Sequence, residues 1–297
     1  MGGTRLGFIG LGTMGEPMCR NLATKTGTAV SASDLAKEPL ARLADAGVTD
    51  AGSIAGVLVA SDIVFLSLPG GRELDIVCNG KGGVLENARA GQTIVDLGTS
   101  PVPLTRALAQ ACQAKGAHYA DAPVARTRQA AIDGTLSIMV GGSDALFARI
   151  EPLLRTMASE VSHCGGTGAG QIAKIMNNMV IAQTVVALSE ALEIARANGA
   201  DGARLFEVLT KGSADSFALR NHGLKAMIPG AFPERAFSAA YMLKDVGYAL
   251  DLAREGGTTD EGARVARAWL ERAISDGDGD AYWPVLNKAM ARRRRKS

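Results

Sequence analysis

Cysteine and histidine are scarce in this chain of 297 residues. The four cysteines are widely separated and form no C-x-x-C pair, so neither a disulfide framework nor a zinc site is indicated. The three histidines show neither metal-ligand spacing nor a usable catalytic triad. The residues concerned are Cys19, Cys78, Cys112, Cys164, His118, His163 and His222. Metal catalysis is therefore not expected, and proton transfer must fall to another residue type.

A long apolar run is also missing, and we expect no leader segment. The longest apolar run, Met179 to Leu188, contains Gln183 and Thr184 and is too short to cross a bilayer. The chain passes from Met1-Gly2-Gly3 directly into strand-like sequence, so we expect no signal peptide. We therefore expect a cytoplasmic protein with no membrane partner.

Charge of one sign is in excess only at the C-terminus. The formal net charge is +2, yet five basic residues stand at positions 292–296, so the rest of the chain is net negative. A basic tail can contact nucleic acid or anionic lipid, but a solvated, disordered terminus is the simpler interpretation. We expect no nucleic-acid partner.

Glycine is abundant, with 36 residues, and 47% of the chain is hydrophobic. This composition suits an α/β protein with one large or two smaller cores. Apolar strand-like runs alternate with helical patterns, which predicts βαβ units and a mostly parallel sheet. The expected strands after the first two are 63–68, 93–97, 118–124 and 135–140. Ligands bind beyond the carboxyl ends of such strands, where Leu68, Pro69, Thr99 and the turn 121–127 fall.

A dinucleotide-binding fingerprint opens the chain. A strand at 6–9 runs into G-x-G-x-x-G and then into a helical pattern, and a second strand, 29–33, ends at Asp34. The six residues of the motif are Gly10, Leu11, Gly12, Thr13, Met14 and Gly15. The glycines allow a tight turn, a close approach to pyrophosphate and helix–strand packing. Asp34 would bind the adenosine ribose and repel a 2'-phosphate, which favours NAD over NADP. Lys37 weakens that preference, and a structural turn is the alternative role for Asp34.

After Cys164 the alternation of strand and helix patterns gives way to helical patterns alone. Residues 171–198 read as one helix, apolar on most sides, and four shorter helical segments follow at 202–211, 216–228, 237–255 and 261–275. We predict a Rossmann dinucleotide-binding domain over 1–165 and an all-helical domain over 166–297. The apolar long helix also predicts a homo-oligomer, either a dimer or a tetramer.

Glycine-rich sequence precedes this helix, and its first turns contain Lys174, Asn177 and Asn178. Residues three and four apart share a helical face, so these side chains are expected to point into one space. Burial near a helix N-terminus would lower the pKa of a lysine towards that of a proton donor or acceptor. A solvated lysine beside two capping asparagines is the alternative.

Four segments in order resemble the signature blocks of the β-hydroxyacid dehydrogenase family. They read GFIGLGTMGEPM, DAPVARTRQAAIDGTLSIMVGG, GTGAGQIAKIMNN and YMLKDVGYAL, and the likeness runs from residue 5 to about residue 255. The resemblance implies a Rossmann domain, a helical domain and an active site in the cleft between them. It implies that Lys174 is catalytic, that Asn178 binds substrate and that Lys244 closes over the nicotinamide. It also implies cofactor contacts at Leu68, Pro69 and Thr99.

One block departs from the family pattern. Where most members have Ser-Gly-Gly after DAPV, this chain has Ala125, Arg126 and Thr127. A guanidinium and a hydroxyl suit an anion with three oxygens. This variant resembles the sulfolactaldehyde reductases, which implies that 3-sulfolactaldehyde is reduced to 2,3-dihydroxypropane-1-sulfonate. The alternative is a carboxylate substrate, as in 3-hydroxyisobutyrate dehydrogenase or tartronate semialdehyde reductase, with Arg126 paired to a neighbouring acid. An imine reductase and a non-catalytic scaffold are less favoured, because Lys174 is retained.

Overall fold

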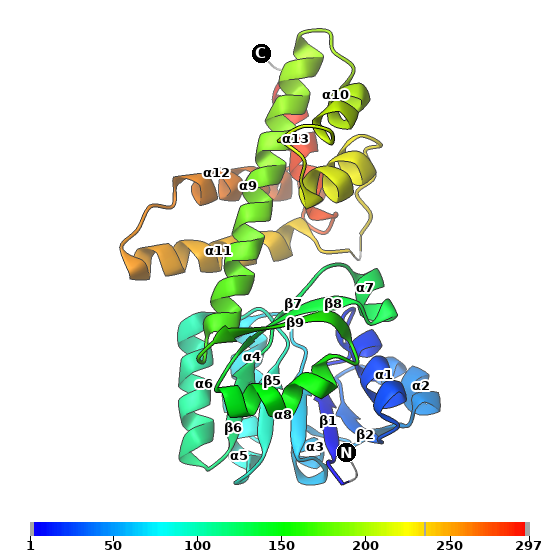
Figure 1. The fold of residues 1–297 in the computed structure, drawn as a ribbon, viewed down its shortest axis with the longest axis vertical. Coiled ribbons are helices and arrows are strands. Elements are labelled where there is room, and N and C mark those ends of the chain that lie inside the picture. The colour runs from blue at the N-terminus through cyan, green and yellow to red at the C-terminus, as the bar shows by residue number, and fades with distance from the viewer. Residues whose placement is uncertain (1–2, 235, 295–297) are drawn as a thin grey trace. The chain divides into compact units, whose positions relative to one another are not determined.

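The computed structural model describes residues 3–234 and 236–294. The chain divides into two compact units, one ending at Lys174 and the other beginning at Ile175. The division falls inside the long helix α9, Ala169–Ala197, so Lys174 belongs to the first unit and Asn178 to the second. Each unit is described by itself (Figure 1).

The first unit is built on a nine-stranded sheet in the order β3-β2-β1-β4-β5-β6-β8-β7, with β9 paired to β8. β1 to β6 pair with their neighbours in parallel, and β8 pairs with β6 antiparallel. The strands are β1 Leu6–Ile9, β2 Val30–Ser33, β3 Val48–Asp50, β4 Ile63–Leu66, β5 Thr93–Asp96, β6 His118–Asp121, β7 Val124–Ala125, β8 Leu136–Gly141 and β9 Ala158–Gly165. The predicted Rossmann-like, mostly parallel sheet is confirmed.

Helices cover both faces of this sheet because successive strand residues point to opposite sides. Phe8 and Phe65 pack with Met18 and Leu22 of α1 on one face. Val64 and its neighbours pack with α3, α4 and α6 on the other. The helices of the unit are α1 Gly15–Thr26, α2 Glu38–Leu43, α3 Ile54–Ala60, α4 Gly71–Asn79, α5 Val84–Asn87, α6 Val102–Ala114, α7 Arg128–Asp133 and α8 Asp144–Leu154.

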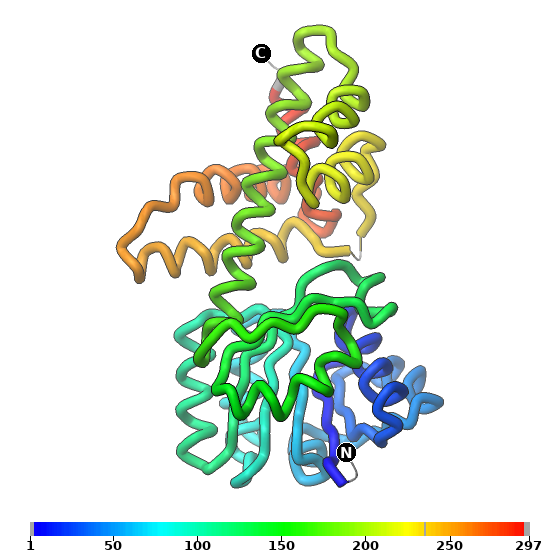
Figure 2. Tube along the Cα trace, viewed as in Figure 1, coloured from blue at the N-terminus to red at the C-terminus, as the bar shows by residue number. Residues whose placement is uncertain are grey.

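The second unit is helical throughout most of its length. Its core gathers apolar residues from α9, from Phe206 on α10, from α11 and α12, and from Trp283 and Leu286. α11 and α12 run side by side, joined by a turn at Gly257 (Figure 2). The elements are α10 Gly202–Leu209, a π-helix at Leu219–Met227, α11 Ala239–Gly256, α12 Glu261–Ala273, a second π-helix at Ile274–Asp278, a short 3-10 helix at Trp283–Val285 and α13 Leu286–Arg294.

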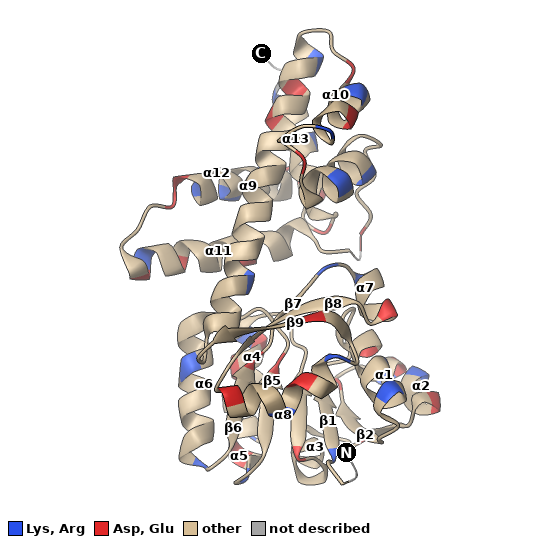
Figure 3. Ribbon diagram, in the orientation of Figure 1, with Lys and Arg blue, Asp and Glu red and all other residues tan. Residues whose placement is uncertain are grey.

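α9 contains no charged residue between Lys174 and Glu190, and the middle of its ribbon is tan in Figure 3. Within the described residues it is the one helix long and apolar enough to cross a membrane by length and composition. Core helices of water-soluble proteins pass the same test, and Val185, Val186 and Leu192 of α9 lie in the core of the second unit. Length and composition therefore do not make α9 a membrane span.

The basic tail is described only in part. The guanidinium of Arg292 pairs with Asp276 and Asp278 at 3.1 and 3.0 Å. Arg295 and Lys296, the last two basic residues of the tail, lie outside the described residues. Arg292 itself is tied to the second unit.

Candidate active site

The glycine-rich loop after β1 has the geometry that its motif predicts. Gly10 has φ +91°, and a Cβ at this position would lie 2.3 Å from the Ser67 carbonyl oxygen. A Cβ at Gly15 would lie 2.0 Å from the Gly10 carbonyl oxygen. Both positions therefore require glycine for the turn and for helix packing. A Cβ at Gly12 would meet nothing within 4 Å, so this glycine borders open space.

These features fit a dinucleotide. α1 begins after Met14, and no side chain caps its N-terminus. Its first backbone N–H groups can therefore donate to a bound phosphate. The loop follows β1, and Leu68 and Pro69 follow β4, the strand beside it. The chain reverses its strand order at this place, where ligands of such sheets bind.

Asp34 lies directly beside the glycine-rich loop. Its carboxylate accepts the backbone N–H of Leu11 and, at 2.7 Å, that of Ala36. Lys37 does not pair with Asp34 but with Asp50, with Nζ 2.9 Å from Oδ2. The cation that weakened the preference for NAD is thus already neutralised by an acid.

Lys174 is buried, with 8% of its surface exposed, which excludes the solvated-lysine alternative. The start of its helix is held by Asp121 at the end of β6. The Asp121 carboxylate accepts the backbone N–H groups of Gly168 at 2.7 Å and Gln171 at 2.9 Å. Burial raises the pKa of Asp121, and these N–H donors counteract the rise.

A second buried carboxylate, Asp96 at the end of β5, lies beside Asp121 in the sheet register. Burial raises its pKa to about 7. Its Oδ1 accepts the Gly98 N–H at 2.9 Å, and its Oδ2 accepts from the Ser100 hydroxyl at 3.0 Å and from Gln171 Nε2 at 3.3 Å. Sequence reasoning missed Asp96 and Gln171 as site residues, and it included Asp121 only as the first residue of the turn 121–127. The signal for the two acids was their place at the carboxyl ends of neighbouring strands.

In the second unit, Asp245 joins two predicted site residues. Asn178 Nδ2 donates to Asp245 Oδ2 at 2.6 Å, and Lys244 Nζ lies 3.0 Å from Asp245 Oδ1. The Lys244 ammonium also lies 5.6 Å from the centre of the Tyr241 ring and 5.0 Å from that of Tyr248, which are cation–π distances. Asp245 was missed by the sequence analysis, although it directly follows Lys244.

Asn177 does not share the surroundings of its neighbour. Asn178 is 4% exposed, whereas Asn177 is an exposed residue that donates to the Asn178 carboxamide oxygen at 3.0 Å. The expectation that Asn177 points into the same space as Lys174 and Asn178 is therefore wrong. Consecutive residues on a helix are separated by about 100°, which places Asn177 and Asn178 in different environments.

The turn that departs from the family pattern is strained at Arg126. Its φ is +86°, the one non-glycine positive φ among the described residues. Its Nη1 donates to the Thr135 carbonyl oxygen at 2.5 Å and to the Ser159 hydroxyl at 2.8 Å. These partners are neutral, so the alternative of a salt bridge to a neighbouring acid is not what the structure shows. Thr127 accepts the N–H of Ala130 and so caps α7.

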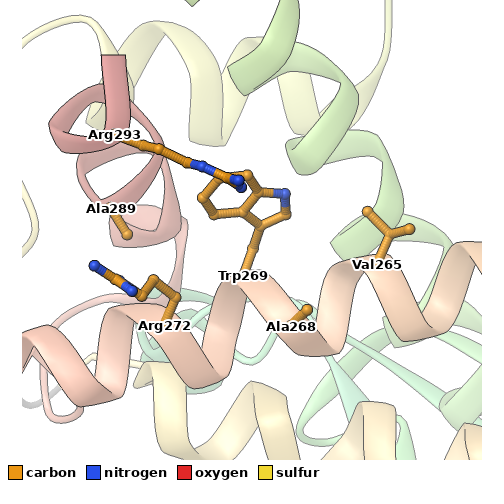
Figure 4. Close-up of a pocket in the computed structure, with 6 residues that line it drawn as sticks. All are labelled: Val265, Ala268, Trp269, Arg272, Ala289 and Arg293. Carbon is orange, nitrogen blue, oxygen red and sulfur yellow. The ribbon is translucent and has the colours of Figure 1, made fainter. Parts of the chain in front are cut away.

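The predicted residues therefore form separate groups within each unit. The first unit holds the glycine-rich loop with Asp34, the Lys174 helix start with the Thr99 turn, and the Ala125–Thr127 turn. The second unit holds Asn178 with Lys244. A hollow of about 490 Å³ in the second unit contains none of the predicted site residues (Figure 4). Its lining residues are Val265, Ala268, Trp269, Arg272, Ala289 and Arg293.

Comparison with known proteins matches this arrangement along almost the whole chain. Residues 5–166 match the family described as the NAD binding domain of 6-phosphogluconate dehydrogenase. Residues 168–283 match the NAD-binding family of NADP-dependent 3-hydroxyisobutyrate dehydrogenase. The chain is 38% identical to 2-(hydroxymethyl)glutarate dehydrogenase of Eubacterium barkeri, covering 85% of this chain and 83% of that one. It is 37% identical to 2-hydroxy-3-oxopropionate reductase of Escherichia coli, covering 84% of each.

The chain belongs to the β-hydroxyacid dehydrogenase family. A solved structure of Mycobacterium tuberculosis 3-hydroxyisobutyrate dehydrogenase with L-serine superposes with a TM-score of 0.87 at 30% identity, covering 97% of this chain and 99% of that one. The protein is thus an enzyme of the dehydrogenase/reductase class, and its cofactor is a nicotinamide dinucleotide.

Proposed function

We propose that this protein interconverts a small anionic aldehyde and the corresponding hydroxy acid, with Lys174 as general acid and base. Bound NADH would supply a hydride to the aldehyde carbon, and negative charge would grow on the carbonyl oxygen. Lys174 gives a proton to that oxygen, and in the oxidative direction it removes the proton from the alcohol. Burial of the ammonium and the rigid start of α9 support this role, because both restrict where the proton can go.

We further propose NAD rather than NADP as the cofactor. Two observations support this choice, namely the carboxylate of Asp34 beside the glycine-rich loop and the pairing of Lys37 with Asp50. The carboxylate would repel a 2'-phosphate, and the nearby cation is engaged by an acid.

The substrate that we propose first is 3-sulfolactaldehyde. The observation that carries this choice is Arg126 at a positive φ. A non-glycine residue in the left-handed region costs on the order of 1–2 kcal/mol, which glycine would avoid. An arginine at this position therefore indicates that its guanidinium has a function that offsets the cost of the backbone conformation. A guanidinium has five N–H donors, so it can serve Thr135, Ser159 and an anion together. The Thr127 hydroxyl, which accepts from Ala130, can still donate its own hydrogen.

A carboxylate semialdehyde is the second candidate, and the named relatives favour it. The substrates in their names, 2-(hydroxymethyl)glutarate and 2-hydroxy-3-oxopropionate, are carboxylates. In that case the Ala125–Thr127 turn would bind the smaller anion.

Initial rates with NADH and each of three aldehydes test the proposal. The panel is 3-sulfolactaldehyde, tartronate semialdehyde and methylmalonate semialdehyde. We expect the highest kcat/KM with the sulfonate. A higher value with either carboxylate would put the second candidate first, and no turnover of any aldehyde would contradict the oxidoreductase mechanism.

We also propose a cytoplasmic homo-oligomer. Val180 and Ile194 on α9 are 58% and 64% exposed, which is unusual for large aliphatic side chains on a helix that also fills a core. Light scattering on the purified protein would show a mass above one chain of 30.7 kDa. A monomer at micromolar concentration would contradict this part of the proposal.

A further inference from the structure

The carboxyl ends of β5 and β6 bring two buried acids together under the start of α9. Asp96 and Asp121 are register partners in the sheet, and both are fully buried. Buried carboxylates persist only where donors satisfy them. The donors here come largely from the first turn of α9 and from the turn after β5, so the two acids join these segments.

Asp121 binds the backbone of α9 and leaves no room for side chains. It accepts the N–H groups of Gly168 and Gln171. A Cβ at Gly170 would lie 2.9 Å from Asp121 Oδ2, and a Cβ at Gly141 would lie 2.5 Å from Oδ1. The carboxylate of Asp121 thus fixes the start of α9 against β6 through backbone N–H groups of α9 and of the residue before it.

The side chain of Gln171 makes the connection to β5. Its Oε1 accepts the backbone N–H of Ser100 at 3.0 Å, and its Nε2 donates to the Gly98 carbonyl oxygen at 2.9 Å and to Asp96. A backbone N–H needs an acceptor and a carbonyl needs a donor, and the carboxamide of Gln171 supplies both. Gln171 is fully buried, and no solvent can replace these partners.

We propose that Gln171 is a positioning residue for Lys174, holding the first turns of α9 against the turn that contains Thr99. Lys174 lies one helical turn after Gln171, and Thr99 lies between the two residues that Gln171 bonds. This inference rests on the proposed function, because it takes Lys174 as the proton donor. Displacing such a donor by about 1 Å can reduce a rate about a hundredfold.

Gln92, directly before β5, provides a matched control. It is also fully buried, and it too makes three hydrogen bonds: Nε2 donates to the carbonyls of Leu58 and Ser61 at 2.8 Å, and Oε1 accepts the Arg89 N–H at 3.3 Å. It precedes β5, at the amino edge of the sheet, far along the strand from Asp96. Leucine at either position removes a buried carboxamide of equal size.

The experiment compares Gln171→Leu with Gln92→Leu in the full chain. We expect both to lower Tm by similar amounts. Only Gln171→Leu should lower kcat, by roughly tenfold to a hundredfold, with KM for NADH changed less than about threefold. In the double variant with Lys174→Ala, Gln171→Leu should cause no further loss of kcat, because its effect passes through the lysine.

The inference is overturned if Gln171→Leu keeps kcat within about twofold of the wild type, or if Gln92→Leu loses as much. Additive losses in the double variant would overturn it as well. Should Gln171→Leu fail to fold, Asp96→Asn takes its place. Asparagine has nearly the volume of aspartate, but its NH2 group would face another donor, either Gln171 Nε2 or the Gly98 N–H, and would break that hydrogen bond. We expect the same loss of kcat. Failure of the proposed function shows itself separately, as normal turnover in Lys174→Ala alone.

Discussion

The carboxylate of Asp34 accepts the backbone N–H of Leu11, the second residue of the glycine-rich motif. The same carboxylate accepts the N–H of Ala36, so its position is fixed from both sides. Because the contact joins the end of β2 to the loop after β1, the acid is held in place before any cofactor binds.

Cofactor choice should therefore follow the charge of Asp34. We expect kcat/KM to favour NADH over NADPH by about tenfold or more, since a fixed carboxylate repels a 2'-phosphate. Asp34→Asn should narrow this ratio, whereas Lys37→Ala should leave it unchanged, because Lys37 is paired with Asp50. Equal rates with both cofactors in the wild type would refute the role of Asp34.

Removal of the Lys174 ammonium should abolish most of the catalysis while sparing cofactor binding. Lys174→Ala is expected to lower kcat at least about a hundredfold, the usual scale for losing a general acid. NADH binding, followed by the fluorescence of the reduced nicotinamide, should persist. Lys225→Ala, which removes an exposed lysine, is the control. Near-normal turnover in a folded Lys174→Ala variant would assign the proton transfer to another group.

The sequence predicted the regular parts of the fold well because periodicity reports burial. The first strand was expected at 6–9 and is β1 Leu6–Ile9, and the long helix expected at 171–198 is α9 Ala169–Ala197. β9, Ala158–Gly165, was not expected, because its mixed polar and half-buried residues lack an apolar run. The three-residue β3 is too short to produce a pattern.

The site was harder to predict, because its contacts depend on register and backbone geometry. That Asp96 faces Asp121 follows from the pairing of β5 with β6, which no local pattern encodes. The positive φ of Arg126 comes from the turn that it occupies. The exposure of Asn177 beside the buried Asn178 depends on how the rest of the second unit packs around α9.

Protonation of His222 should destabilise the second unit in mild acid. Burial lowers the pKa of His222 to about 4, and its Nδ1 lies 2.7 Å from the Tyr282 hydroxyl. The unfolded chain, with a histidine pKa near 6.5, binds the proton more readily than the folded one. The stabilisation is complete above about pH 6.5 and is lost as the pH falls towards 4, by about 3 kcal/mol.

Urea unfolding at pH 7 and pH 4, compared between the wild type and His222→Phe, measures this loss. Both tryptophans of the chain, Trp269 and Trp283, belong to the second unit, so their fluorescence reports its unfolding. The advantage of the wild type over the variant should shrink by about 3 kcal/mol at the lower pH. Asp96 has a raised pKa, so its contribution to stability changes with pH in the opposite direction. Because both proteins contain Asp96, this contribution cancels in the difference between them. A difference that does not change with pH would contradict the prediction.

Restoring the common family turn should change which anion the enzyme prefers. The variant combines Ala125→Ser with Arg126→Gly, which relieves the positive φ and removes the guanidinium. Arg126 is exposed when no substrate is bound, and loss of a charge-assisted hydrogen bond to an anion costs on the order of 2 kcal/mol. Activity on 3-sulfolactaldehyde should therefore fall by about thirtyfold or more. Activity on a carboxylate semialdehyde should fall far less, or rise.

The decisive quantity is the ratio of kcat/KM for the two substrate types before and after the exchange. Ser159→Ala is the control, since it removes one protein partner of Arg126 and keeps the guanidinium. We expect it to leave the preference for the sulfonate in place. A ratio that is unchanged in the double variant would show that Arg126 does not bind the anion. The sulfonate proposal would then fail, and the carboxylate substrate would replace it, because the strained arginine would have no role in recognition.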